Sequence, residues 1–146
     1  MKSLKITSDA FEHGEMIPSR YTCDGANVNP PLKIFGIPEK TKSFAVIVDD
    51  PDAPSGTWVH WVVWDIPVSE IIIEHSVPGS EGMNDFGKHH YGGPCPPSGT
   101  HRYFFKVYAL DAELDLDSSS TKADLENVMK PHVLAKGELM GKYKKL

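Results

Sequence analysis

The sequence predicts a mostly β protein, a two-sheet β-sandwich with one helical segment near the C-terminus. Three observations support this fold class. Twelve prolines and twelve glycines are spread along 146 residues, which leaves little room for long helices. Segments rich in β-branched and aromatic residues recur between these breakers. Apolar residues at helical spacing occur in one region only, after Ser119.

Six segments have the composition of strands. Residues 43–48 form a continuous apolar run bounded by turn residues, which is typical of a buried strand. Residues 57–64 and 102–110 are β-branched or aromatic over most of their length. The six predicted strands are residues 4–7, 43–48, 57–64, 71–74, 102–110 and 138–143.

The helical region begins with a capping-box pattern, in which Thr121 is the N-cap and Asp124 follows three residues later. Three apolar residues at helical spacing come next: Leu125, Val128 and Met129. Pro131 is expected to kink or split this helix. We expect the helix to resume over residues 133–135 and to stop at Gly137.

Length and charge limit the possible functions. A chain of this length fits a single domain, which we expect over residues 1–146. It can bury roughly 70% of its unfolded surface, so it needs no metal or disulfide to fold. Fifteen Lys and Arg against twenty Asp and Glu give a net charge of −5. This charge argues against broad nucleic-acid binding, and any bound anion must be held by local donors.

The sequence favours a cytoplasmic location. No secretory signal is recognisable, and no apolar run approaches the roughly 18 residues that span a bilayer. We therefore expect no stable membrane insertion. Cys23 and Cys95 are too few for a disulfide framework. Two free thiols are favoured because cytosolic disulfides are uncommon, although the fold could bring the two residues together.

The first segment with chemical potential is Asp49-Asp50-Pro51-Asp52-Ala53-Pro54, directly after the buried strand. Its prolines end the strand and stiffen the turn, which fixes two or three carboxylates at a strand end. Loops at such ends often carry function. The simpler interpretation is a rigid acidic turn that caps the strand.

The second segment, residues 91–103, is a loop rich in Gly and Pro that enters the longest strand. Glycines allow a close approach of backbone N–H groups to a ligand. His101 and Tyr103 are two residues apart on that strand and so share a face. An imidazole and a phenol together offer two donors to an oxyanion. The alternative is a Pro-rich connection followed by a half-buried His and a core Tyr.

His60 lies between apolar residues in Trp58-Val59-His60-Trp61, which is unusual for a surface histidine. It is either a hydrogen-bonded core histidine or a second imidazole in the same pocket as His101.

These motifs, in this order, resemble the phosphatidylethanolamine-binding protein family, also called Raf-kinase-inhibitor-like proteins, and most of all its short bacterial and archaeal branch. The resemblance extends from about Leu4 to Tyr143. Its matching segments are residues 50–54, 58–60 and 93–103, with a weaker match at 21–32.

The resemblance implies a β-sandwich with a surface pocket for phosphate, phosphorylethanolamine and similar small anions. It implies a non-enzymatic binding protein without a cofactor, and regulation of a protein partner is a further role that the resemblance suggests. The inserted Cys95-Pro96-Pro97 makes the pocket loop differ from that of eukaryotic members. Residue by residue, the matching positions that should line the pocket are Asp50, Asp52, Trp58, His60, Gly93, Pro94, His101 and Tyr103.

Carboxylates in an anion site need a division of roles. We expect one Asp to accept a hydrogen bond from His60 or His101, which favours the imidazolium form. The protonated imidazoles, the Tyr103 hydroxyl and the Gly93 N–H would then donate to ligand oxygens. The second Asp would receive an ammonium group, such as that of phosphorylethanolamine, or hold a shared proton.

Other functions stay open. The loops at residues 79–90 are where a protease or kinase partner would bind if the protein is an inhibitor. A small hydrolase could use Ser98 or Cys95 with His101, although no G-x-S-x-G motif is present. A metal site is the least favoured, since no spacing of His and Cys matches a zinc signature. A homodimer is possible through the aromatic strand at residues 58–64.

Overall fold

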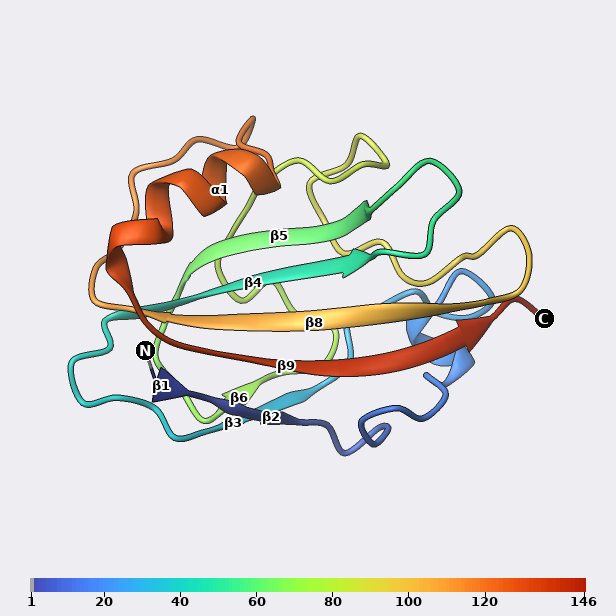
Figure 1. Cartoon of the computed structure of the whole chain (residues 1–146), viewed down its shortest axis with the longest axis horizontal. Coiled ribbons are helices and arrows are strands. Elements are labelled where there is room, and N and C mark those ends of the chain that lie inside the picture. The colour runs from blue at the N-terminus through green and yellow to red at the C-terminus, as the bar shows by residue number, and fades with distance from the viewer. Residues whose placement is uncertain (1) are drawn as a thin grey trace.

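Two sheets of unequal size form the molecule in the computed structural model, which describes residues 2–146 (Figure 1). The larger sheet has six strands in the order β1-β9-β8-β4-β5-β7, and the smaller has the order β2-β3-β6. The strands are β1 (Lys2–Ser3), β2 (Lys5–Thr7), β3 (Leu32–Phe35), β4 (Ser43–Asp50), β5 (Trp58–Ile66), β6 (Ile71–Ile72), β7 (Ser80–Glu81), β8 (Thr100–Leu110) and β9 (Val133–Lys144). The predicted mostly β, two-sheet fold with one C-terminal helical segment is confirmed.

Strand β4 lies at the centre of the larger sheet and is buried along its whole length. Phe44, Val46 and Val48 belong to the core between the two sheets. Ala45 and Ile47 pack in a second core against helix α1 (Lys122–Met129). Because side chains alternate between the faces of a strand, a strand covered on both sides must be apolar at every position. This explains the unbroken apolar run seen in the sequence.

Helix α1 begins at the predicted capping box. The Thr121 N–H donates to Asp124 Oδ2 over 2.9 Å, and the Asp124 N–H donates back to Thr121 Oγ1. Figure 1 shows the helix on one side of the larger sheet, near β5. Pro131 lies in a short 3₁₀ turn (Lys130–His132) that follows the helix directly.

The expected continuation of the helix over residues 133–135 is wrong, because Val133 begins β9. This strand pairs antiparallel with β8 from Leu110↔Val133 to Thr100↔Lys144. Gly137 therefore lies inside the strand and does not end a helix. Long-range pairing with an eleven-residue partner strand outweighs the local helical pattern of three residues.

Several element boundaries also differ from the sequence-based ones. The predicted strand at residues 138–143 is the second half of the longer β9, and the one at 71–74 shrinks to β6. Strands β1, β3 and β7 have two to four residues each and were not predicted. Within residues 2–146, no helix is both long and apolar enough to cross a bilayer.

Candidate functional site

Three neighbouring strands bring Asp50, His60, His101 and Tyr103 to one cavity of about 220 Å³. Asp50 is the last residue of β4, His60 lies near the start of β5, and the other two lie near the start of β8. The complete lining consists of Asp50, Ala53, Pro54, Trp58, His60, Phe86, Cys95, Pro96, Pro97, His101 and Tyr103.

A β-bulge in β5 turns His60 towards this cavity. Val48 pairs with Trp61 and the next residue of β4 pairs with Val59, so His60 is the extra residue. Val59 and Val62 both pack in the core under α1, while Trp61 lies in the core between the sheets. Strict alternation would place His60 on the same face as Val62. The bulge instead lets His60 and Trp61 face the same layer, a common use of bulges next to functional sites.

Asp50 and His101 form a buried pair. His101 Nδ1 lies 2.7 Å from Asp50 Oδ2, and their side chains are 9% and 4% exposed. The other oxygen of the carboxylate accepts the Asp52 N–H over 2.8 Å. Since a carboxylate is the acceptor, Nδ1 of the imidazole carries the hydrogen, and Nε2 is the nitrogen left for a ligand. The expected Asp–His bond is therefore present, and it involves His101.

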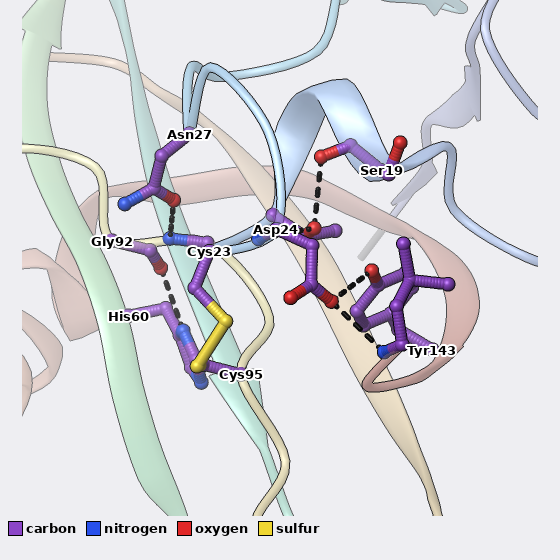
Figure 2. The surroundings of a disulfide bond; sticks show 11 residues. Ser19, Cys23, Asp24, Asn27, His60, Gly92, Cys95 and Tyr143 are labelled. Atoms are coloured by element: carbon purple, nitrogen blue, oxygen red, sulfur yellow. Dashed lines mark hydrogen bonds between the residues drawn. A yellow bond between two sulfur atoms is a disulfide. The ribbon is translucent and has the colours of Figure 1, made fainter.

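His60 has a different partner. Its Nδ1 lies 2.6 Å from the Gly92 carbonyl oxygen, so Nδ1–H donates and Nε2 is again left over (Figure 2). Burial lowers the pKa of His60 below its usual value of 6.5, against the opposing effects of the Gly92 carbonyl and the Asp50 charge. His60 is therefore neutral at neutral pH, and Nε2 carries a lone pair. The expectation of two protonated imidazoles is wrong for His60.

The Tyr103 side chain lies between the two imidazoles. Its ring meets the His60 ring edge-on at 5.3 Å between centroids and stacks with the His101 ring at 6.5 Å. The residue is 1% exposed, and its hydroxyl has no hydrogen-bond partner among residues 2–146. Burial raises the pKa of Tyr103 most, followed by the Asp50 charge and a weak interaction with the Asp50 carboxylate, so the side chain stays a phenol with a hydrogen to donate.

Three of the eight predicted pocket residues lie outside the cavity lining. Both oxygens of Asp52 accept from the Arg102 guanidinium at 2.9 Å, and Arg102 lowers the pKa of Asp52 to about 2. The Gly93 N–H donates to Asn27 Oδ1 over 2.8 Å, so the expectation that it donates to a ligand is wrong. The Pro94 carbonyl accepts the Cys23 N–H. These three residues hold the loops around the cavity in place.

The acidic motif thus separates its carboxylates. Asp49 points to the other face of the sheet, where it is 1% exposed and pairs with Lys106 and Lys122 at 3.0 and 2.8 Å. Asp50 faces the cavity, and Asp52 fastens the turn to Arg102. Only one of the three carboxylates can therefore meet a ligand in the cavity.

The mouth of the cavity is aromatic. Trp58 and Phe86 are 37% and 41% exposed, and their rings meet edge-on at 5.6 Å. Phe86 also lies edge-on to His60 at 5.2 Å. Asn84 shapes this loop, since its side chain donates to the His60 carbonyl and accepts the Phe86 N–H. Phe86 was not predicted as a pocket residue, because its only signal in the sequence is a lone aromatic residue in a polar loop.

The two cysteines form a disulfide, with Cα atoms 5.4 Å apart, so the prediction of free thiols is wrong (Figure 2). That prediction rested on cell compartment, whereas the fold brings residues 72 apart in the chain into contact. Cys95 is therefore not a free nucleophile for a hydrolase, and Ser98 is exposed outside the lining. Residues 2–146 contain no cluster of His, Cys, Asp and Glu that could hold a metal ion.

The chain is similar to known proteins over nearly its whole length. The family model for phosphatidylethanolamine-binding protein matches residues 7–144. The UPF0098 protein of Methanothermobacter thermautotrophicus is 47% identical over 150 residues, which cover 97% of this chain and 99% of that protein. The UPF0098 protein of Aquifex aeolicus is 45% identical over 152 residues, which cover 97% of this chain and 89% of that protein.

Two crystal structures share the fold over nearly the whole chain. A phosphatidylethanolamine-binding protein homologue of Chlamydia trachomatis has a TM-score of 0.94 at 38% identity, with both chains covered completely. E. coli YbcL, described as a member of the mammalian PEBP family, has a TM-score of 0.90 at 34% identity, with 99% of each chain covered. This chain belongs to the phosphatidylethanolamine-binding protein family.

Proposed function

We propose that this protein binds a small phosphate-like anion in the cavity lined by Asp50, His60, His101 and Tyr103, and does so without chemically changing it. The observation that carries the proposal is the Tyr103 hydroxyl, which is buried in the cavity wall without a partner among residues 2–146. A buried donor without a partner costs about 1–3 kcal/mol, which a ligand oxygen would recover.

The two imidazoles complete the set of contacts. Tyr103 donates through its hydroxyl, while His60 and His101 each use Nδ1 internally and offer Nε2. Neutral His60 presents an acceptor, so a ligand must either bring a hydrogen to it or bind together with a proton. Charge-assisted hydrogen bonds contribute roughly 1.5–3 kcal/mol each. Binding coupled to proton uptake at His60 would convert its contact from neutral to charge-assisted.

The charge of the cavity favours an anion of low charge. The lining contains no Lys or Arg within residues 2–146, and Arg102 is occupied by Asp52. A singly charged phosphate, a phosphodiester or a zwitterion such as phosphorylethanolamine fits this set better than a highly charged nucleotide. The ammonium of a zwitterion would face Asp50, the only carboxylate among the lining residues.

Calorimetric titration of inorganic phosphate at pH 5.5, 6.5 and 7.5 tests the proposal. We expect tighter binding at lower pH, and at least about tenfold weaker binding for Tyr103→Phe, which removes one charge-assisted bond. Tyr108→Phe is the matched control, because Tyr108 lies on the same strand but packs with the core on the opposite face. The absence of binding at every pH, or equal affinities of Tyr103→Phe and the parent, would refute the proposal.

Two features support binding over catalysis. Cys95 is bridged, and Ser98 makes no hydrogen bond to His101 among the described residues. Activation of a serine requires a base within hydrogen-bond reach. A covalent serine probe should therefore leave Ser98 unlabelled, and stoichiometric labelling would favour the hydrolase alternative.

A role as a protein inhibitor is the second candidate. The exposed Trp58–Phe86 pair beside the loops of residues 79–90 favours it, because exposed aromatic residues at a pocket mouth often bind proteins. Assays of a purified protease or kinase, with this protein added in the presence and absence of phosphate, test this role.

The cytoplasmic location and the homodimer stay predictions, and size-exclusion chromatography with light scattering checks the dimer.

A further inference from the structure

The disulfide connects the loop of residues 92–99, which supplies one wall of the cavity, to a second loop outside the cavity. Cys95 lines the cavity, whereas Cys23 lies in the loop that follows the 3₁₀ turn at Ser19–Tyr21 and is not part of the lining. Figure 2 shows the bridge crossing from this loop to the loop that also carries Gly92. Cys23 is exposed and Cys95 is half-buried, so a small or protein thiol can reach the bridge from solvent.

The wall is held differently before and after Cys95. Before it, the Gly92 N–H donates to the His60 carbonyl, the Gly93 N–H to Asn27, and the Pro94 carbonyl accepts from Cys23. From residue 95 to residue 99, the only contact of hydrogen-bonding type found among the described residues is that between the Cys95 main chain and the Tyr103 hydroxyl. Pro96 and Pro97 have no N–H to donate. Apart from that contact, the disulfide is the only cross-link to this part of the wall within residues 2–146.

The same part of the wall lines the cavity. Cys95, Pro96 and Pro97 line it together with His101 and Tyr103. The Cys95 main chain lies close enough to the Tyr103 hydroxyl to lower its pKa, against the larger opposite effects of burial and of the Asp50 charge. A movement of residues 95–97 would therefore open Tyr103 to water. A phenol exposed to water already donates its hydrogen to water. An anion that replaces this water therefore gains less free energy than one that satisfies a buried donor without a partner.

We propose that the Cys23–Cys95 bridge is a redox modification site that controls ligand affinity, with a dithiol reductant as its reaction partner. This proposal rests on the proposed anion-binding function. In the oxidised protein the wall is fixed over Tyr103. In the reduced protein the segment 95–99 is free to move, and the anion binds more weakly.

The reaction is a thiol–disulfide exchange between the bridge and the dithiol. A thiolate of the reductant attacks the Sγ of Cys23, the more exposed cysteine, so a new S–S bond forms and the Cys23–Cys95 bond breaks. Cys95 leaves as a thiolate and takes up a proton. The second thiol of the reductant then displaces Cys23, which leaves as a thiol, and two electrons have passed from the dithiol to the protein. An oxidised dithiol of the same class reverses the change.

Reduction should alter the wall without unfolding the domain. The Gly92 N–H bond to the His60 carbonyl and the Gly93 N–H bond to Asn27 involve neither cysteine and still anchor the start of the loop. The core between the sheets contains neither cysteine. In the folded protein, the expected effect is therefore on affinity and local mobility.

Calorimetric titration of inorganic phosphate at pH 6 compares four samples: the oxidised parent, the parent with dithiothreitol, and Cys23→Ser with and without dithiothreitol. Cys23 is the residue to change because it lies outside the cavity lining. We expect the reduced parent and Cys23→Ser to bind about three- to tenfold more weakly than the oxidised parent. Dithiothreitol should have no further effect on Cys23→Ser. Ser98→Ala keeps the bridge and should respond to dithiothreitol like the parent.

Amide hydrogen exchange supplies a readout that needs no ligand. The amide of Cys95, which is half-buried and contacts the Tyr103 hydroxyl, should exchange faster after reduction, while that of Gly93 should keep its protection because it is bonded to Asn27. Equal affinity and equal exchange in the oxidised and reduced states would overturn the proposal. If the oxidised parent does not bind phosphate, the proposed function fails. Faster exchange on reduction would then show that the bridge fixes the wall, but the control of affinity would be rejected with the function.

Discussion

Asp50 at the end of β4 and His101 at the start of β8 form a buried hydrogen bond, Oδ2 to Nδ1, across 51 residues of chain. The pair fixes which ring nitrogen of His101 carries the hydrogen and leaves Nε2 for the cavity. It also joins the two strands that frame the site. Two short motifs that the sequence places far apart therefore act as one unit.

Removal of the Asp50 carboxylate should be strongly destabilising. Asp50→Ala leaves the His101 ring buried without its partner and also removes the acceptor of the Asp52 N–H. Loss of one partner of a buried pair costs about 3 kcal/mol. Asp52→Ala is the matched comparison, because the Asp52–Arg102 side chains are 30% and 49% exposed, and an exposed pair contributes about 1 kcal/mol or less. Urea denaturation measures both free energies of unfolding, and equal losses would contradict the assignment of the buried pair.

Stability should fall as the pH is lowered from 7 towards 5. Burial lowers the pKa of His60 in the folded protein below its unfolded value of 6.5, so the unfolded chain binds more protons in this window. One such group can change the free energy of unfolding by at most about 1.4 kcal/mol per pH unit. The pKa of Asp52 is lowered to about 2, so the stability that this residue contributes is fully present above its unfolded value of 3.8. That stability is lost only as the pH falls from there towards 2, outside this window.

His60→Gln should remove most of this dependence, because glutamine does not titrate. Urea denaturation of both proteins at pH 5.5 and 7.5 checks it. Phosphate should oppose the trend in the parent, since an anion that binds the protonated form stabilises the protein most at low pH. A parent protein whose free energy of unfolding is the same at both pH values would show that His60 is not held neutral by burial.

Reduction of the disulfide should lower the stability of the whole domain even if the wall moves only locally. A bridge between residues 72 apart restricts the unfolded chain, and loops of this size correspond to about 4 kcal/mol in the chain-entropy model. Thermal unfolding with and without dithiothreitol measures the change, and Cys23→Ser should match the reduced parent. A melting temperature that does not respond to the reductant would mean that the bridge does not form in solution.

The sequence predicts the three central strands β4, β5 and β8 well because their residues are apolar on one or both faces. It predicts Asp50, His60, His101 and Tyr103 together because the family motifs place them, and the cavity contains all four. Which nitrogen each imidazole uses could not be predicted, since it depends on Gly92 and Asp50 as partners in space. The same reason applies to the bulge at His60, which appears only when β5 is paired with β4.

Long-range contacts explain the wrong predictions as well. Residues 133–135 have a short helical pattern, but β8 offers them a full set of strand partners. Cys23 and Cys95 are brought together by packing of two loops, about which spacing in the chain says nothing. Gly93 was assigned to ligand binding because glycine permits close approach. It does permit close approach, but to the backbone of Tyr21 and the side chain of Asn27.

Gly93→Ala should therefore disturb the site from outside the cavity. A Cβ at this position would lie 2.2 Å from the Tyr21 carbonyl oxygen and 2.5 Å from Asn27 Oδ1, distances that the backbone cannot tolerate without moving. Because the Gly93 N–H bond to Asn27 anchors the start of the wall, its displacement should shift residues 94–97 as well. Overpacking of this kind typically costs about 1–3 kcal/mol. Phosphate titration and urea denaturation of Gly93→Ala should show both weaker binding and lower stability.

Asn27→Ala separates the two causes. It removes the acceptor of the Gly93 N–H without adding an atom beside Tyr21, and Asn27 itself is exposed. If the hydrogen bond holds the wall, Asn27→Ala should weaken phosphate binding while costing about 2 kcal/mol of stability, because an alanine at the Asn27 φ of 60° adds about 1 kcal/mol of strain to the lost hydrogen bond. If steric crowding alone matters, Asn27→Ala should bind phosphate like the parent. Gly93→Ala with unchanged affinity and stability would show that the wall does not depend on this contact at all.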